Sequence, residues 1–173
     1  MNPLPFILLA ISLPLLLGGC GEKHEGVNAK KLEFIGVDGI VMAYFKGSET
    51  PYTGKVYSLH PNGQKKKEGN FKEGKTDGLL VRWHKNGQKE TEGNYKDGKA
   101  DGLFVEWYEN GQKLMKGNFK DSKPEGLVVH WHGNGQKMAE VNFKDGKLVE
   151  GSDKYWNSKG EPVATNEAAN NYP

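Results

Sequence analysis

GLLVRWHKNGQKETEGNYKDGKADG, residues 78–102, contains the features from which the fold of this chain can be predicted. It holds two runs with strand-like composition, GLLVRWH at 78–84 and QKETEGNYK at 88–96, separated by Lys-Asn-Gly. Asn-Gly between two such runs is the strongest short-range signal of a β-hairpin. DGKADG at 97–102 then connects the hairpin to whatever follows. The stretch is therefore predicted to form strand, tight turn, strand and looser turn.

The same unit recurs every 24 residues along the chain. Asn-Gly-Gln-Lys occurs at 62–65, 86–89, 110–113 and 134–137, and this places the loop glycines Gly63, Gly87, Gly111 and Gly135. Three tryptophans keep the period and a fourth belongs to a decayed fifth copy: Trp83, Trp107, Trp131 and Trp156. A fixed period of this length indicates a repeat array. We predict an all-β fold, an elongated single-layer antiparallel sheet of successive β-hairpins over 54–163, with repeats that start near 54, 78, 102, 126 and 151.

The hairpin register follows from the type of loop. A two-residue Asn-Gly turn would pair Val81 with Glu92, whereas a three-residue loop of residues 85–87 pairs Val81 with Thr91. The three-residue loop, with Gly87 in the left-handed region, keeps apolar positions together, and a slip of one residue would undo that pattern. We therefore predict the three-residue loop and the register that comes with it.

Period-2 alternation divides the array into two unequal faces. One face is expected to carry Leu79, Val81, Trp83 and Tyr95 with their equivalents in the other units. The other face is expected to be polar, apart from one apolar column: Val56, Leu80, Phe104 and Val128. Glycines such as Gly93 are expected to leave room for a neighbouring aromatic ring to lie across the backbone.

The composition excludes several classes of protein. The chain has 173 residues, enough for one ordinary domain. Its 24 basic and 22 acidic residues are interspersed and give a net charge of +2, and Arg82 is the only arginine. Nucleic-acid binding normally uses a basic stripe rich in arginine, so we predict no nucleic-acid partner. Cys20 is the only cysteine, which excludes an intrachain disulfide and a multi-cysteine metal site.

The N-terminus has the features of a targeting signal. Residues 4–17 form an apolar run that has the length of a signal-peptide core and is shorter than a comfortable membrane span. The run ends in Leu17, Gly18, Gly19 and Cys20, which resemble the lipobox of bacterial lipoproteins. The resemblance implies a signal peptide at 1–19, cleavage before Cys20 and lipid attachment to it, although residues 1–6 lack the usual Lys or Arg. An uncleaved anchor and a buried hydrophobic helix are the alternatives.

Lipid attachment would place the protein in the bacterial cell envelope, anchored to a membrane. Gly21 follows the cysteine where an aspartate would signal retention in the inner membrane, so the resemblance implies the outer membrane in a Gram-negative cell. Residues 20–31 are predicted to form a polar tether. Residues 32–53 are predicted to form an N-terminal cap hairpin, and residues 164–173 a disordered tail.

The repeat resembles the MORN repeat, in the bacterial variant found in YwqK-type antitoxin-like proteins. The shared pattern is G-[LK]-x-x-x-W-x-x-N-G-Q-K-x-x-x-G-N-[FY]-K-[DE]-G, preceded by the entry phrase PYTGKVY at 51–57. The resemblance covers about two-thirds of the chain. It implies a sheet of successive hairpins, a scaffold or toxin-neutralising role, and no catalytic residues.

The side chains that could carry chemistry repeat with the structural period. His60, His84 and His132 share one position in the unit, and units about 10 Å apart are too distant to share one metal ion. Pairs of carboxylates such as Asp97 and Asp101 flank turns, where aspartate is favoured for local reasons. We therefore predict no enzyme activity, no catalytic residue, no cofactor, no metal and no small-molecule substrate.

The predicted function is a non-enzymatic, lipid-anchored repeat scaffold for protein–protein interaction at the bacterial cell envelope. One alternative is a toxin-neutralising antitoxin or immunity protein whose partner is a toxin. A second alternative is a module that binds the cell wall or a membrane surface through lysine and tryptophan columns.

Overall fold

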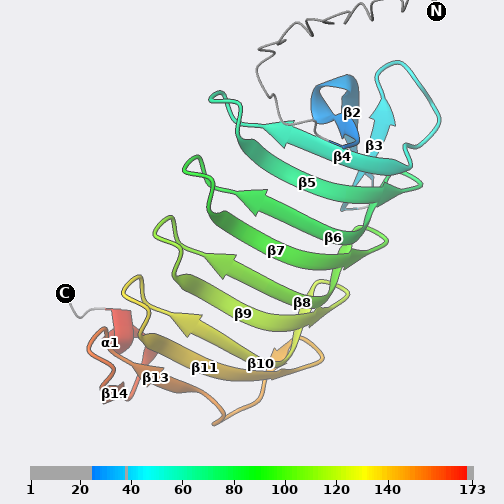
Figure 1. The fold of residues 1–173 in the computed structure, drawn as a ribbon. Helices are drawn as coiled ribbons and strands as arrows, with labels where there is room; N and C mark the ends of the chain where they lie inside the picture. Colours follow the sequence, from blue (N-terminus) through cyan, green and yellow to red (C-terminus); the bar gives the residue numbers. More distant parts are fainter. Residues whose placement is uncertain (1–24, 38, 171–173) are drawn as a thin grey trace, which may run out of the picture.

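A computed structural model describes residues 25–37 and 39–170, and most of them form one twelve-stranded sheet (Figure 1). From β4 to β11 each strand pairs antiparallel with the next strand of the chain. The strands of this array are β4 (Gly54–Leu59), β5 (Lys65–Lys72), β6 (Lys75–Trp83), β7 (Lys89–Lys96), β8 (Lys99–Trp107), β9 (Lys113–Lys120), β10 (Lys123–Trp131) and β11 (Lys137–Lys144). The predicted fold class, an elongated antiparallel sheet of successive hairpins, is confirmed.

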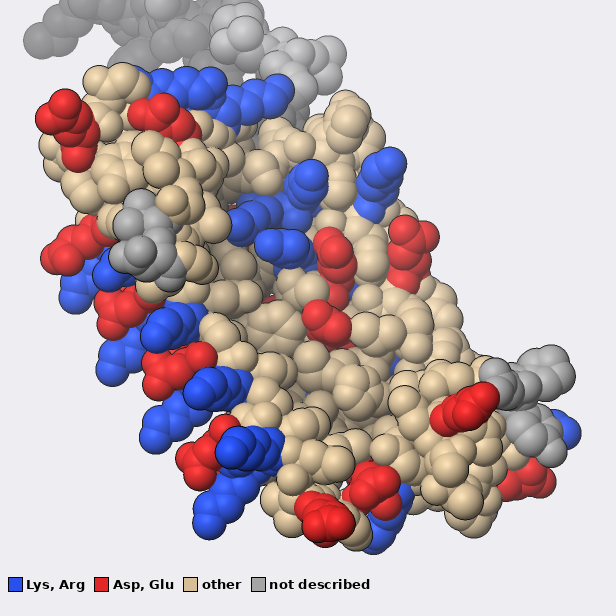
Figure 2. Space-filling model, turned by 180° about the vertical axis from the view of Figure 1, so that it is seen from behind, with Lys and Arg blue, Asp and Glu red and all other residues tan. Residues whose placement is uncertain are grey.

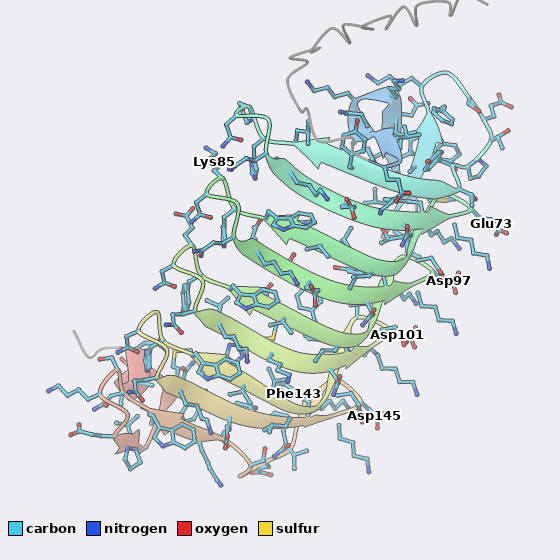
Figure 3. The ribbon with its side chains drawn as sticks, viewed as in Figure 1. Glu73, Lys85, Asp97, Asp101, Phe143 and Asp145 are labelled. Atoms are coloured by element: carbon cyan, nitrogen blue, oxygen red, sulfur yellow. The ribbon has the colours of Figure 1, made fainter. Side chains whose placement is uncertain are left out.

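Two kinds of turn connect the strands, one kind at each end of the strands. At one end of the strands, marked by Lys85 in Figure 3, the loops have three residues. They contain the glycines Gly63, Gly87, Gly111 and Gly135, whose φ angles lie between 82° and 85°. At the other end of the strands, marked by Glu73, Asp97 and Asp145, the connections have only two residues. Asp97 and Gly98 both have positive φ, 50° and 82°, as a tight type I′ turn requires. The expected order is wrong in this respect, because the Asp-Gly turn is the tighter of the two.

The predicted register is wrong in the body of each hairpin. Val81 lies opposite Glu92 and not Thr91, although Trp83 lies opposite Lys89 as a three-residue loop demands. The register shifts between Arg82 and Trp83, which leaves Glu90 as an extra residue in β7. Such a β-bulge changes the pairing by one residue beyond it. The loop and the bulge together give the strand pairing that a two-residue turn would have given.

The bulge also changes which side chains share a face. Tyr95 lies opposite Gly78, on the side of the sheet that carries Leu80, and Phe119 lies correspondingly opposite Gly102. The expectation that Tyr95 and its equivalents lie beside Trp83 is therefore wrong. We name the two sides by their aromatic residues. The Phe face carries Val56, Phe71, Leu80, Tyr95, Phe104, Phe119, Val128 and Phe143, and the Trp face carries Leu79, Val81, Trp83 and their equivalents.

Glycines in every second strand provide space for the apolar column of the Phe face. Leu80 lies opposite Gly69 and Gly93, and Phe104 lies opposite Gly93 and Gly117. A Cβ built on Gly93 would lie 2.2 Å from Cδ2 of Phe104. This confirms that an aromatic ring lies across the backbone at that glycine. Leu80 and Val128 fill the corresponding spaces over Gly69 and Gly117 with aliphatic groups.

A separate hairpin covers the N-terminal end of the array (Figure 1). It consists of β2 (Leu32–Val37) and β3 (Ile40–Phe45), and its Leu32 and Ala43 are buried with Tyr52, Val56 and Phe71 in the main hydrophobic cluster. Before it, β1 (Val27–Asn28) pairs parallel with β4, and η1 (Ala29–Lys31) follows. The predicted tether thus ends in ordered structure.

The fifth repeat closes the other end of the sheet. It consists of β12 (Lys147–Leu148), β13 (Lys154–Trp156), β14 (Pro162–Val163) and a short helix, α1 (Asn166–Asn170). The helix contacts β11, β13 and β14, and Ala169 is fully buried. The prediction of a disordered tail is therefore wrong for α1. Asn157 occupies the position of the repeated histidines, and its buried side chain holds the last loop through its contacts with Lys159 and Glu161.

Candidate functional site

The Phe face is the candidate site because its central part lies between the covered ends of the sheet. Tyr95, Phe104 and Phe119 are half-buried and form a run of edge-on contacts, with ring centroids 6.4 and 5.6 Å apart. At the N-terminal end, Phe34 of the hairpin contacts Phe71 at 6.1 Å. Beyond the hairpin the strands of the array continue without a second sheet layer among the described residues (Figure 1). Half-buried aromatic side chains on a polar background are typical of binding surfaces.

Three glutamates of the Trp face form ion pairs with lysines, whereas Lys113 and Lys116 of the third unit have no ion pair among the described residues. Glu68 forms ion pairs with Lys65 at 2.8 Å and with Lys55 at 3.3 Å. Lys89 pairs with Glu92, and Lys137 pairs with Glu140. Lys65, Lys89, Lys113 and Lys137 also lie over the rings of Trp83, Trp107, Trp131 and Trp156, at 5.2 to 5.8 Å from the ring centroids. The four tryptophans are half-buried beneath these cations.

The charged side chains of the Phe face are left without such partners. Lys67 and Arg82 lie directly opposite each other on β5 and β6, and neither has an ion pair within 4.0 Å among the described residues. Burial, and secondly the charge of Arg82, hold the pKa of Lys67 below its usual value. Like charges in directly opposed positions of a sheet are destabilising, so this pair is a local cost to the folded state.

An acidic pair lies next to the basic one. Glu106 occupies the same row of the Phe face as Arg82, two strands away with Thr91 between them. Burial, and secondly the charge of Glu90, raise the pKa of the Glu106 carboxyl. Figure 2 shows basic side chains close to the hairpin, with acidic ones beside them and uncharged surface beyond. The Phe face therefore combines apolar surface with two adjacent charge clusters of opposite sign.

A hollow of about 440 Å³ opens where the hairpin meets the Phe face. Phe34 and Val41 of the hairpin form its apolar side. The sheet contributes the charged and polar part of the lining, and Ala29 of η1 completes it. The lining residues from the sheet are Ser58, Lys66, Lys67, Arg82 and Glu90.

The repeated histidines have a structural position that the sequence does not reveal. Nε2 of His84 lies 2.9 Å from the backbone carbonyl of Trp107 in the next unit. Tyr108 replaces histidine in the third unit, and its hydroxyl donates to the carbonyl of Trp131 at 2.8 Å. His60 and His132 make the same contact with Trp83 and Trp156. The sequence does contain one signal of this role, which is that Tyr108 replaces histidine in the third unit. Both side chains can donate a hydrogen bond to a carbonyl of the next unit.

Of the repeated carboxylates labelled in Figure 3, Asp97 lies in a two-residue turn and Asp101 lies in β8. Glu125 accepts a hydrogen bond from the backbone N–H of Asp145 at 2.8 Å, and Asp121 lies 3.8 Å from Nζ of Lys99. Within the described residues, no group of three or more His, Cys, Asp or Glu side chains is placed to hold a metal ion. The helices in the same part of the chain are too short or too polar to cross a membrane.

The predicted lipid-attachment residues lie outside the described residues: Leu17, Gly18, Gly19 and Cys20. The other predicted site residues are the tryptophans and loop glycines of the array. The structure distributes these along the Trp face and one sheet edge and does not bring them together in a single site.

Comparison with known proteins identifies the repeat. The MORN repeat variant matches residues 52–73, 76–97, 100–121 and 124–145. Each match ends in a two-residue turn and contains one complete three-residue loop. A search of curated proteins finds no match to the chain. Because the four matches together cover half of its length, this chain belongs to the MORN repeat variant family.

Proposed function

We propose that this protein is a non-enzymatic scaffold that binds a protein partner on the Phe face and is held at the bacterial cell envelope by a lipid on Cys20. Repeats of this family commonly form protein- or membrane-interaction modules and are generally not enzymes. The observation that carries the proposal is the contrast between the two faces. The glutamates of the Trp face are paired with lysines, although Lys113 and Lys116 are not. On the Phe face Lys67, Arg82 and Glu106 all have no ion pair among the described residues.

A protein partner would satisfy the Phe face in two ways. Half-buried rings such as Phe104 and Phe119 offer apolar contact, and aromatic anchors supply much of the energy of protein interfaces. The adjacent basic and acidic clusters would fix the orientation of the partner, because complementary charges give specificity more than affinity. The order of the two charge clusters along the face then favours a partner with an acidic group near the hairpin and a basic group further along the array.

Antitoxin or immunity function is the second candidate. The resemblance to antitoxin-like repeat proteins favours it, and the same face would bind the toxin. A lipid anchor outside the cytoplasm is compatible with immunity against a toxin delivered to the envelope. Binding of wall polymers or of a membrane surface is the third candidate, but the lysines of the Trp face already contact Glu side chains and indole rings.

Capture from a detergent extract of the envelope tests the partner-binding proposal. The bait is the full chain, compared with Glu106→Lys on the Phe face and with Glu109→Lys, which makes the same charge change in an exposed loop. We expect a partner that the parent chain and Glu109→Lys capture and that Glu106→Lys loses. Capture that is equal with all three baits, or no capture by any, contradicts binding at this face.

Anchoring is tested separately by Cys20→Ser. We expect the parent chain to incorporate a palmitate analogue and to sediment with membranes, and the variant to do neither. A parent chain that stays unlabelled and free of membranes would end the lipoprotein hypothesis and leave the partner-binding proposal standing.

A further inference from the structure

We propose that the hollow between the hairpin and the sheet is a binding site for a monocarboxylate with an apolar body, of the size of a medium-chain fatty acid. Lys67 and Arg82 would bind the carboxylate, and Phe34 and Val41 would contact the apolar body. All four residues line the same hollow of about 440 Å³. The site shares Lys67 and Arg82 with the charged part of the proposed partner surface, but its test measures labelling of the hairpin and not capture of a partner.

The cationic side of the hollow is built for an anion. Lys67 and Arg82 are directly opposed across neighbouring strands, and Lys66 lines the same hollow. Lys67 is half-buried and has no ion pair among the described residues. A carboxylate between the two cations would replace their mutual repulsion by two charge-assisted hydrogen bonds. The planar guanidinium of Arg82 suits a carboxylate, whose two oxygens it can bind in parallel.

The apolar side of the hollow is incompletely covered. Phe34 is 42% exposed and Val41 is 54% exposed, although both belong to the hairpin that packs against the sheet. Neighbouring hairpin side chains such as Leu32 and Ala43 are buried. Phe34 and Val41 therefore remain available to contact an acyl chain, and their burial by a ligand would be favourable in proportion to the apolar area covered.

Glu90 lowers but does not cancel the positive charge of the hollow. Its carboxyl lines the hollow together with Lys66, Lys67 and Arg82, and its charge is close enough to raise the pKa of Glu106. Three cations and one carboxylate leave a net positive lining, which attracts an anionic headgroup and repels an amine. The lining thus favours a fatty acid over a fatty amine.

Photo-crosslinking on the full chain in lipid nanodiscs tests this site. The probe is a decanoate analogue with a diazirine at the end of its chain, and adducts are located by mass spectrometry of peptides. We expect adducts on residues of the β2–β3 hairpin, competition by decanoate that decyl phosphate does not exceed, and little competition by acetate or decylamine. Arg82→Gln and Lys67→Gln should each lower hairpin labelling about tenfold. Lys89→Gln on the Trp face, the matched control, should leave it unchanged.

The position of the adducts distinguishes this site from labelling elsewhere on the chain. Adducts confined to the apolar residues 4–17 or spread evenly over the array would overturn the proposal, as would equal competition by decylamine. Hairpin labelling that Arg82→Gln does not lower would also overturn it, provided that the variant melts at the temperature of the parent chain. Stronger competition by decyl phosphate than by decanoate would show that the site binds a phosphate and would overturn the assignment to a carboxylate. None of these results affects partner capture by Glu109→Lys, so the two proposals fail independently.

Discussion

Gly93→Ala should destabilise the array because Phe104 occupies the space of the missing side chain. A Cβ at residue 93 would lie 2.2 Å from Cδ2 and 2.6 Å from Cε2 of that ring. The ring cannot retreat easily, because Tyr95 and Phe119 lie on either side of it at 6.4 and 5.6 Å between centroids. Overpacking of this kind costs about 1–3 kcal/mol.

Urea unfolding followed by tryptophan fluorescence measures the effect. With a slope of about 2 kcal/mol per M, a loss of about 2 kcal/mol lowers the unfolding midpoint by about 1 M. Gly36→Ala is the matched control, because Gly36 also lies in a strand and a Cβ there would meet nothing within 4 Å. We expect this control to leave the midpoint unchanged or to raise it slightly, since alanine restricts the unfolded chain more than glycine does.

A double-mutant cycle identifies the cause of the loss. Phe104→Ala removes the ring, so adding Gly93→Ala to that variant should cost less than about 0.5 kcal/mol. The same loss with and without the ring would refute the close approach of Phe104 to Gly93. An unchanged midpoint in the single variant Gly93→Ala would refute it as well.

Five more variants test one loop and two of the histidines. Gly87→Val should lower the urea midpoint more than Lys85→Val, because Gly87 has a φ of 85° and a β-branched residue there is strained by about 1–2 kcal/mol; equal midpoints would contradict the loop geometry. His84→Phe should cost about 1 kcal/mol by removing the hydrogen bond to the carbonyl of Trp107, whereas His84→Tyr should retain most of the stability, as Tyr108 makes this bond in the third unit; thermal melts that rank the two variants equally would argue against the bond. Burial lowers the pKa of His130 from its ordinary 6.5, so the unfolded chain binds its proton first and the free energy of unfolding should fall as the pH drops below 6.5. Urea titrations between about pH 7.5 and pH 5 should show a smaller fall for His130→Gln than for the parent chain, and parallel curves would refute this assignment.

Features that depend on local interactions could be predicted from the sequence. The Asn-Gly period gave the number and direction of the hairpins, and the loop glycines gave the three-residue loops, because only a residue tolerant of positive φ closes them without strain. The room that Gly93 leaves for a neighbouring aromatic ring was likewise predictable from the repeated glycines, but only the structure identifies that ring as Phe104. The family followed from the same pattern.

The candidate site was less predictable, because it depends on one residue that the pattern does not mark. Glu90 bulges out of β7 and shifts the pairing of Val81 from Thr91 to Glu92. That shift moves Tyr95 and its equivalents to the face of Leu80, and it places Glu68 and Glu92 on the side of Trp83 within reach of lysines. A bulge is a balance between side-chain packing on two faces and hydrogen bonding in the ladder, so period-2 alternation alone does not reveal it.

Which charges remain open depends entirely on the folded arrangement of the strands. Lys67 and Arg82 are 15 residues apart in the chain and adjacent in the sheet. The hairpin that makes the hollow beside them precedes the array in sequence and folds back onto its Phe face. Composition shows 24 basic and 22 acidic residues in near balance, and it contains no information on which of them meet. Pairing of side chains across strands and burial under a second element are long-range contacts. Which charges of the Phe face stay without a partner is therefore decided only when the chain folds.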